Sequence, residues 1–152
     1  MTERPRYDRI APDAYRAMRA LEDYVRSTGL EPPLLELVRL RASYLNGCAY
    51  CVDMHAKDAR AAGESEQRLY AVPVWREAPF FTARERVALA WAESVTRLGA
   101  DHVTDDLYEQ AVREFGEKDL VELTLAVAMI NAWNRMAISF RAEPVATTEP
   151  PT

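Results

Sequence analysis

The chain has 152 residues, of which 49% are apolar and 28% charged, a length and composition typical of one globular domain. Its net charge of −5, without a Lys/Arg cluster, argues against nucleic-acid binding. The longest apolar stretch, 120–140, is interrupted by Glu122, Arg135 and two asparagines, so we expect no membrane span. Residues 1–6 lack the apolar segment of a signal peptide, so we expect a cytoplasmic protein.

The hydrophobic pattern predicts a series of helices and no strand of useful length, and therefore an all-α fold. Pro32 can begin a helix after the break at Gly29. Thr82 and Glu85 fit a capping box, in which both side chains bind backbone N–H groups at a helix start. The predicted helices cover residues 12–27, 34–45, 48–62, 82–98, 104–116 and 117–141, with one or two turns over 65–70.

The last predicted helix and the residues after it define how the domain ends. Residues 117–141 are apolar around most of the helix circumference, which is typical of a helix that is central in its fold or shared with a neighbouring subunit. Pro144 ends this helix. We find no repeat and no linker, so we expect one domain over residues 1–144 and a disordered tail over 145–152.

Both cysteines and one of the two histidines lie in a single short segment, at Cys48, Cys51 and His55. A helix advances about 100° per residue, which would place these three side chains on one narrow stripe. Asn46 and Gly47 break the preceding helix, so Cys48 falls at or near a helix N-terminus. The free N–H groups and the dipole of a helix start stabilise a thiolate, the reactive form of cysteine. This segment is the chain's best candidate for chemistry.

A Cys-x-x-Cys pair occurs in several kinds of site, of which a thioredoxin-like motif, a zinc site and a pair of structural thiols are three. A thioredoxin-like motif would need a βαβ context, which the pattern lacks. A zinc site could combine the three side chains of this segment with the remote His102, but the three would spread over about 10 Å of helix axis. The cysteines could also be two small buried thiols beside a histidine that packs in the core. We expect no metal and no cofactor.

Glu36 is followed twelve residues later by the Cys-x-x-Cys pair and then by His55, an order that resembles the Glu…Cys-x-x-Cys-x-x-x-His signature of the AhpD-like alkylhydroperoxidases. These proteins belong to the carboxymuconolactone decarboxylase superfamily. The resemblance covers residues 34–98 well, and its motif is specific for the family but not for a substrate. It implies an AhpD-like helical domain of about six to seven helices.

The resemblance also implies a thiol-dependent hydroperoxidase or disulfide oxidoreductase. One cysteine attacks a peroxide and becomes a sulfenic acid, the other condenses with it to a disulfide, and an external thiol reduces the pair again. The family usually gives the attack to the second cysteine, here Cys51, whereas the helix dipole favours Cys48 as the more acidic thiol. The attacking cysteine therefore stays open. His55 would relay the proton, and Glu36 would orient and charge it.

One position departs from AhpD, which has a second histidine directly before the latter cysteine, where this chain has Tyr50. A phenol titrates at about pH 10 and is a poor base at neutral pH. Tyr50 could instead donate a hydrogen bond, line a pocket or pack in the core. Trp133 is a further candidate for a pocket or interface residue, with core packing as its alternative.

The implied partners are a peroxide substrate, an external thiol or dithiol reductant, and further copies of the chain in a homo-oligomer, a hexamer rather than a trimer. The alternative function is a redox-sensing or binding module of the same fold, whose disulfide is a switch with negligible turnover. Steady-state turnover of an organic peroxide distinguishes the two, because a sensor would consume about one equivalent and stop.

Overall fold

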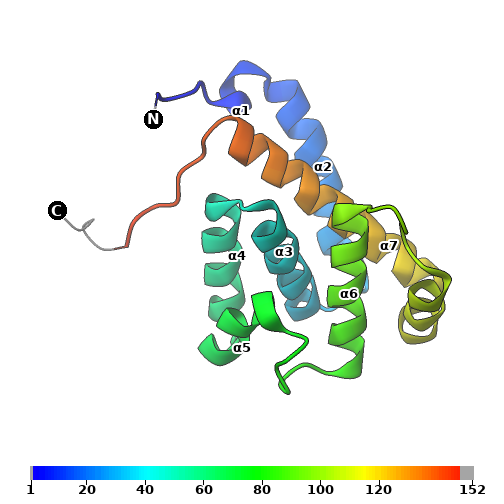
Figure 1. Ribbon diagram of the computed structural model, residues 1–152. Helices are drawn as coiled ribbons and strands as arrows, with labels where there is room; N and C mark the ends of the chain where they lie inside the picture. The colour runs from blue at the N-terminus through cyan, green and yellow to red at the C-terminus, as the bar shows by residue number, and fades with distance from the viewer. Residues whose placement is uncertain (1, 148–152) are drawn as a thin grey trace.

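The computed structural model describes residues 2–147, which contain seven α-helices, one 3₁₀ helix and no strand (Figure 1). These elements are α1 (Tyr7–Ile10), α2 (Pro12–Ser27), α3 (Pro32–Asn46), α4 (Ala49–Ala61), α5 (Glu66–Ala71), η1 (Val72–Val74), α6 (Ala83–Arg97) and α7 (Asp105–Ser139). The expected all-α fold is confirmed. No helix in the described part of the chain has both the length and the apolar content that a membrane crossing requires.

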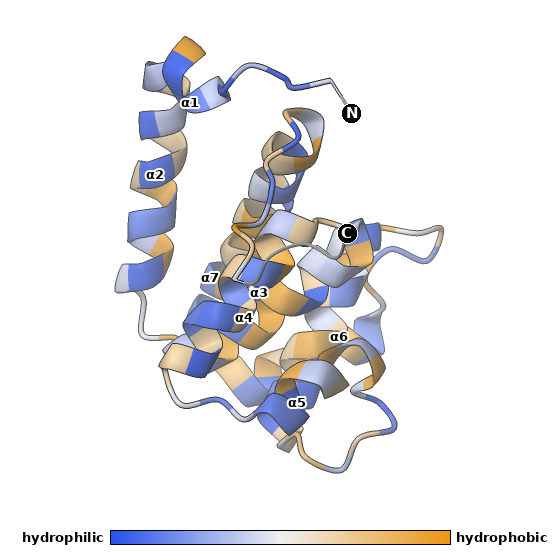
Figure 2. Ribbon diagram, turned by 90° about the vertical axis from the view of Figure 1, so that its left-hand side faces the viewer, coloured by the Kyte–Doolittle hydropathy of each residue, from blue (hydrophilic) through white to orange (hydrophobic). Residues whose placement is uncertain are grey.

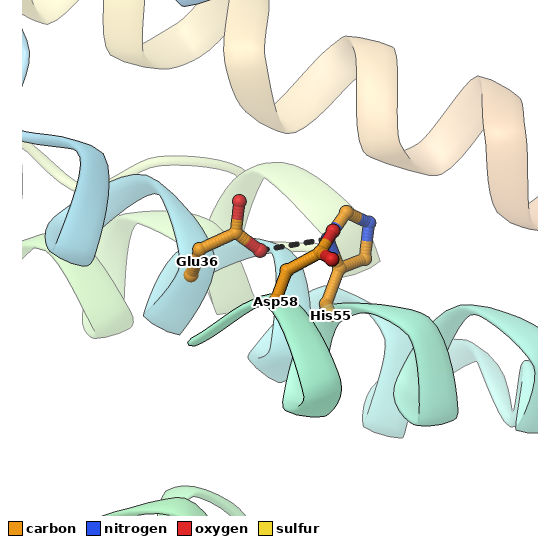
Figure 3. Close-up of side chains that lie close together, drawn as sticks. All are labelled: Glu36, His55 and Asp58. Atoms are coloured by element: carbon orange, nitrogen blue, oxygen red, sulfur yellow. Dashed lines mark hydrogen bonds and ion pairs between the residues drawn. The ribbon is translucent and has the colours of Figure 1, made fainter. Parts of the chain in front are cut away.

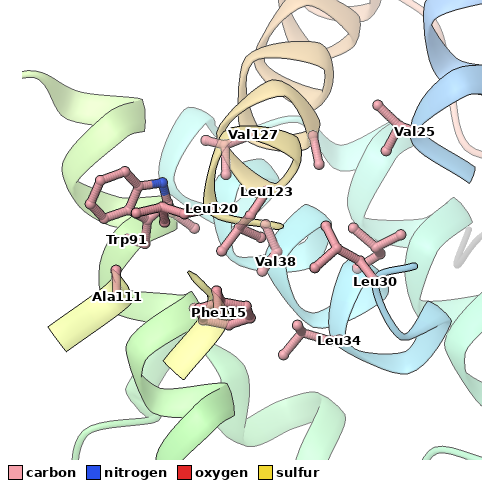
Figure 4. Close-up of a cluster of buried hydrophobic side chains, with 14 residues drawn as sticks. Val25, Leu30, Leu34, Val38, Trp91, Ala111, Phe115, Leu120, Leu123 and Val127 are labelled. Atoms are coloured by element: carbon pink, nitrogen blue, oxygen red, sulfur yellow. The ribbon is translucent and has the colours of Figure 1, made fainter. Parts of the chain in front are cut away.

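Helix α3 lies at the centre of the fold and contacts α4, α6 and α7. Two of its sides are buried, because Leu34 and Val38 belong to one apolar cluster while Leu37 and Leu40 belong to another. The first cluster joins α3 to α2, α6 and α7 (Figure 4), and the second joins it to α4, α5, η1 and α6. Figure 2 shows hydrophobic residues gathered where α3 and α6 meet and hydrophilic residues along the outer side of α2. The side chains of α3 therefore project from a rigid support.

The predicted helix boundaries agree with the structure where a local signal sets them. Helix α2 covers the predicted residues Pro12–Ser27, and α3 begins at Pro32, two residues earlier than expected. At the start of α6, Thr82 Oγ1 accepts a hydrogen bond from the N–H of Glu85, and the Glu85 carboxylate accepts one from the N–H of Thr82. The capping box is therefore confirmed.

The two helices expected over 104–116 and 117–141 form one helical element, α7, with a kink at Gly116. Gly116 has φ 73° and ψ 168°, and glycine adopts this positive φ without the steric cost of a side chain. One helix therefore ends at the glycine and the next begins directly after it, so the two expected helices are confirmed as the two parts of α7. Helix α7 packs against α2, α3 and α6, yet Val121 remains 69% exposed.

Both ends of the chain contain features that the sequence pattern does not predict. Helix α1 is a single turn over Tyr7–Ile10 without a buried residue, so it has no apolar periodicity to reveal it. Just before it, Arg4 Nη1 donates a hydrogen bond to the carbonyl of Ser139, at the end of α7, at 2.6 Å. In the predicted tail, residues 145–147 form no helix, and residues 148–152 lie outside the described residues.

Candidate functional site

Cys48 lies at the junction of α3 and α4. Helix α3 ends at Asn46, and Gly47 adopts the left-handed conformation with φ 71°. Cys48 then occupies the N-cap of α4, and its Sγ accepts a hydrogen bond from the N–H of Cys51 at 3.3 Å. The sulfur thus binds one of the backbone donors that a helix start leaves unpaired. The predicted place of Cys48 at a helix N-terminus is confirmed.

Cys48 and Cys51 are joined by a disulfide, with a Cα–Cα distance of 5.3 Å. This distance lies within the usual range for disulfides. Each cysteine is 1% exposed, and both pack against Ala137 of α7. The structure therefore presents the oxidised state of a pair that solvent barely reaches.

Amide side chains fix the end of α3 to α7. Asn46 Nδ2 donates to Oδ1 of Asn131 at 2.9 Å and to Oδ1 of Asn134 at 2.8 Å. Asn134 is 0% exposed and donates through Nδ2 to Ser43 Oγ at 3.1 Å. These bonds hold the chain two positions before Cys48. In the sequence, Asn131 and Asn134 interrupt an apolar stretch. Because a buried amide must form hydrogen bonds, their position was the only sign that they bind other side chains.

Glu36 of α3 and His55 of α4 face each other (Figure 3). Glu36 Oε2 lies 2.8 Å from His55 Nδ1, and the two residues are 7% and 3% exposed. A carboxylate at Nδ1 fixes the orientation of the ring, stabilises an imidazolium and leaves Nε2 for proton exchange. Figure 3 shows the second ring nitrogen turned away from Glu36, and among residues 2–147 it has no hydrogen-bond partner. The pair thus has the form of an acid–base group.

The Glu36–His55 pair and the cysteine pair share α4 but do not bind each other directly. His55 lies one helical turn after Cys51, and both side chains are buried. Within the described residues, no hydrogen bond joins His55 to either sulfur of the disulfide. The structure therefore brings the four predicted residues together as two bonded pairs on neighbouring turns.

A buried ion network extends from Glu36, and the sequence reasoning missed it. Arg39 donates to Glu36 Oε1 at 2.8 Å and to Glu22 Oε1 at 2.6 Å. Trp133 Nε1 donates to the other oxygen of Glu22 at 3.2 Å. Burial alone would raise the pKa of Glu36, but the hydrogen bond and charge of His55, with the Arg39 guanidinium, hold that pKa below its usual value. The spacing of Arg39, one turn after Glu36, was a local signal, whereas Glu22 comes from another helix.

The two candidate pocket residues, Tyr50 and Trp133, differ in their relation to the pocket. Tyr50 is half-buried, packs against the cysteine pair and lines a pocket together with Tyr15 of α2. Trp133 packs edge-on against Tyr15, with 5.9 Å between ring centroids, and lies outside the pocket lining. Tyr50 therefore lines the pocket directly, whereas Trp133 packs against Tyr15, which is itself a lining residue.

A metal ion could be held by Glu36, His55 and Asp58, because one ligand atom of each lies within 4.8 Å of the others (Figure 3). Asp58 is exposed, whereas Glu36 already binds both His55 and Arg39. The zinc alternative considered from the sequence needs thiolates, and the two cysteines are here joined to each other. The bonds already present favour a proton relay over a set of metal ligands.

Comparison with known proteins identifies relatives that match most of the chain. The sequence profile described as "Carboxymuconolactone decarboxylase family" matches residues 12–94. The uncharacterised protein YdfG of Bacillus subtilis is 37% identical over 139 residues, which are 91% of this chain and 95% of YdfG. A crystal structure from Agrobacterium tumefaciens, of a protein of unknown function named as a candidate antioxidant defence protein AhpD, is 42% identical with a TM-score of 0.92 over 95% of this chain and 99% of that chain. An AhpD-core, peroxidase-related protein from Ralstonia eutropha JMP134 is 26% identical with a TM-score of 0.78, over 89% of this chain and 72% of that chain.

Proposed function

We propose a function for this chain on the basis of its family and its site. The chain belongs to the carboxymuconolactone decarboxylase family as an AhpD-like member. The proposed function is that of a thiol-dependent hydroperoxidase that uses the Cys48–Cys51 pair. The observation that carries the proposal is the buried bond between Glu36 and His55, one helical turn from Cys51. A cysteine pair by itself can be purely structural. A carboxylate-bound imidazole beside it supplies the proton transfers that peroxide reduction requires.

In the first half of the proposed cycle, the Cys51 thiolate attacks the terminal oxygen of the hydroperoxide. An S–O bond forms and the O–O bond breaks, so the sulfur is oxidised to a sulfenic acid and the remaining oxygen leaves as an alkoxide. His55, which has accepted the thiol proton, returns it to the alkoxide, and an alcohol departs. Glu36 supports both transfers because its carboxylate stabilises the charged ring.

In the second half, the Cys48 thiol attacks the sulfenic sulfur, the S–S bond forms and water leaves. One thiol of an external dithiol then attacks Cys51 Sγ, and Cys48 departs as a thiolate at the start of α4. The second thiol of the donor displaces Cys51 from the mixed disulfide, so the donor leaves as a disulfide and both cysteines are reduced. The hydrogen bond from Cys51 N–H to Cys48 Sγ supports this division of roles, because it favours negative charge on the departing sulfur. Two electrons thus pass from the dithiol to the peroxide, and the cycle as written uses no cofactor.

Steady-state turnover tests the proposal. The protein is mixed with an excess of an organic hydroperoxide and of dithiothreitol, and peroxide loss is compared with that in the same mixture without protein. We expect continued consumption over many equivalents of peroxide. If the protein consumes about one equivalent and then stops, it is a redox-sensing or binding module and the hydroperoxidase proposal is wrong.

We also propose that the chain assembles into a homo-oligomer, a hexamer rather than a trimer. Support comes from large apolar side chains that remain exposed on the described surface. Leu21 of α2 is 47% exposed, and Val121 and Ile138 of α7 are 69% and 45% exposed. Burial of these side chains in subunit contacts would remove their apolar surface from water. Light scattering is expected to give a mass several times 17.3 kDa, and a monomer mass at micromolar concentration would contradict the proposal.

A further inference from the structure

A pocket lies beside the cysteine pair, where the N-terminal residues meet the end of α7. Its volume is about 630 Å³, and its wall is formed by residues of the segment 2–8, by Tyr15 and Tyr50, and by residues 140–143. Small-molecule sites in proteins typically have volumes of about 300–1,000 Å³. The pocket therefore has room for a small organic ligand.

Two arginines hold the N-terminal segment in place as one wall of this pocket. Arg4 Nη1 donates to the carbonyl of Ser139 at 2.6 Å, and Arg141 Nη1 donates to the carbonyl of Thr2. The first bond runs from the segment to α7, and the second runs back from the end of α7 to the segment. The wall is thus tied to the fold at two points, and both bonded residues of the segment, Thr2 and Arg4, precede the first helix.

The pocket and the buried sulfurs share a wall. Tyr50 and Ala142 both line the pocket and pack against the cluster of Cys48, Cys51 and Ala137. Since each cysteine is only 1% exposed, a reactant must pass the side chains that cover the sulfurs. Tyr50 and Ala142 are thus the residues that the pocket and the cysteine cluster have in common.

The pocket is rich in aromatic rings. Four of its lining residues are aromatic, namely Tyr7, Tyr15, Tyr50 and Phe140. The ring centroids of Tyr7 and Phe140 are 5.6 Å apart, and those of Tyr7 and Tyr15 are 6.2 Å apart, both in tilted arrangements. These spacings are those at which aromatic rings attract one another, so a further ring in the pocket would find matching partners.

The polar groups of the pocket favour a neutral ligand with a polar end. Its lining contains three arginines and three carboxylates, so their formal charges cancel. Among residues 2–147, Tyr24 is the one tyrosine whose hydroxyl forms a hydrogen bond, which leaves the hydroxyls of Tyr7, Tyr15 and Tyr50 available. Burial raises the pKa of Tyr7, and the proximity of Tyr50 and Tyr15 raises it further. The three phenols thus line one pocket, and their hydroxyls are able to bind a ligand oxygen.

We propose that this pocket binds the organic group of a neutral aromatic hydroperoxide and places its O–O bond at the wall shared with the cysteines. This inference rests on the proposed function and names its substrate class. The Cys51 thiolate takes the terminal oxygen, the O–O bond breaks, and the aromatic alkoxide receives its proton and remains in the pocket as an alcohol until it departs. The ring of the product therefore occupies the same place as the ring of the substrate.

Binding of the product tests the pocket without any turnover. Cumyl alcohol, the product of cumene hydroperoxide, is titrated into the disulfide form and followed by NMR. We expect saturable binding, weakened about tenfold or more by Tyr7→Ala, because the loss of a ring removes both packing area and an aromatic contact. Tyr7→Phe, which keeps the ring, should bind within a few-fold of the wild type. Tyr70→Ala is the matched control, since Tyr70 lies on α5 and is 67% exposed.

A second readout is the ratio of the rates at which cumene hydroperoxide and hydrogen peroxide oxidise the reduced protein. We expect Tyr7→Ala to lower this ratio about tenfold and Tyr70→Ala to leave it unchanged. Equal binding of cumyl alcohol to wild type and Tyr7→Ala, no binding to the wild type, or an unchanged ratio would overturn the inference. If neither peroxide oxidises the wild type, the proposed hydroperoxidase fails, while the binding experiment still decides whether the pocket accepts an aromatic ligand.

Discussion

Arg39 and Arg41 lie two positions apart on α3 and enter two different ion networks. Arg39 binds Glu36 at 2.8 Å and Glu22 at 2.6 Å, whereas Arg41 binds Glu93 of α6 at 2.7 Å. Both networks connect neighbouring helices. In both, burial would raise the pKa of the glutamate, but hydrogen bonds and positive charges hold the pKa values of Glu36 and Glu93 below the usual one. The two networks therefore contain the same structural parts.

They differ in what else the glutamate binds. Glu93 accepts from Trp75 Nε1 at 2.7 Å and from Arg76, whose protons stay in place at neutral pH. Glu36 instead binds His55, whose imidazole has two ring nitrogens that can accept or donate a proton. The Arg39 side chain is 3% exposed, against 14% for Arg41. At one place an arginine–glutamate pair connects helices, while at the other the glutamate of the pair also binds an imidazole one helical turn from Cys51.

Replacement of each arginine should lower the free energy of unfolding by different amounts in the two networks. Arg39→Met leaves two buried carboxylates without their shared cation, so we expect a loss of about 3–5 kcal/mol in the free energy of unfolding. Arg41→Met should cost about 2 kcal/mol or less, because Glu93 keeps two other donors and is partly solvated. Urea unfolding of both variants measures the difference. Equal losses would show that burial does not distinguish the two networks.

Replacement of the glutamates and the histidine should show that only the Glu36 network affects the rate of cysteine oxidation. His55→Gln and Glu36→Gln should each slow oxidation of the reduced cysteines by hydroperoxide about 10²-fold, the effect of a positioned acid or base. The double variant should lose much less than the product of the two effects, because both residues act in one network. Glu93→Gln is the control and should oxidise at the wild-type rate. Stopped-flow oxidation rates that are unchanged in both single variants would make His55 a packing residue.

The effect of acid pH on the free energy of unfolding should be smaller than the effects of these substitutions. Because the pKa of Glu36 is lower in the folded chain than its ordinary value of 4.5, its ionised form stabilises the fold above that value, and this contribution is lost as the pH falls through the folded-state pKa. Glu36→Gln has no such carboxyl to protonate. Between about pH 6 and about pH 3.5, the wild type should therefore lose more unfolding free energy than the variant. If the unfolding free energies of the wild type and Glu36→Gln change with pH in parallel, the pKa of Glu36 is not lowered by folding.

How far the sequence predicts the structure depends on the range of the interactions involved. The bounds of α2 and the capping box of Thr82 and Glu85 follow from neighbouring residues, and both were predicted. The helix end at Gly116 was also predicted, whereas the packing of α7 against α2, α3 and α6 was not. Local patterns contain no information on that packing.

In the candidate site, too, the residues near one another in sequence were predicted, and the long-range contacts were not. The spacing of Cys48, Cys51 and His55 and the family motif led to the residues that the structure brings together. The Glu22–Arg39 bond joins residues 17 positions apart, and the Asn46–Asn134 bond joins residues 88 positions apart, so no motif includes them. The pocket depends on the N-terminal segment lying against the end of α7, which also comes only from tertiary structure.

The central claim is that Cys51 attacks the peroxide and Cys48 resolves the sulfenic acid, and trapping of that acid tests it most directly. Reduced Cys48→Ser and Cys51→Ser are treated with an organic hydroperoxide in the presence of dimedone, and the adduct is located by peptide mass spectrometry. We predict an adduct on Cys51 in Cys48→Ser, none in Cys51→Ser, and no steady-state turnover in either variant. An adduct in Cys51→Ser alone would reverse the two roles, and normal turnover in both variants would show that the pair is structural and the peroxidase account wrong.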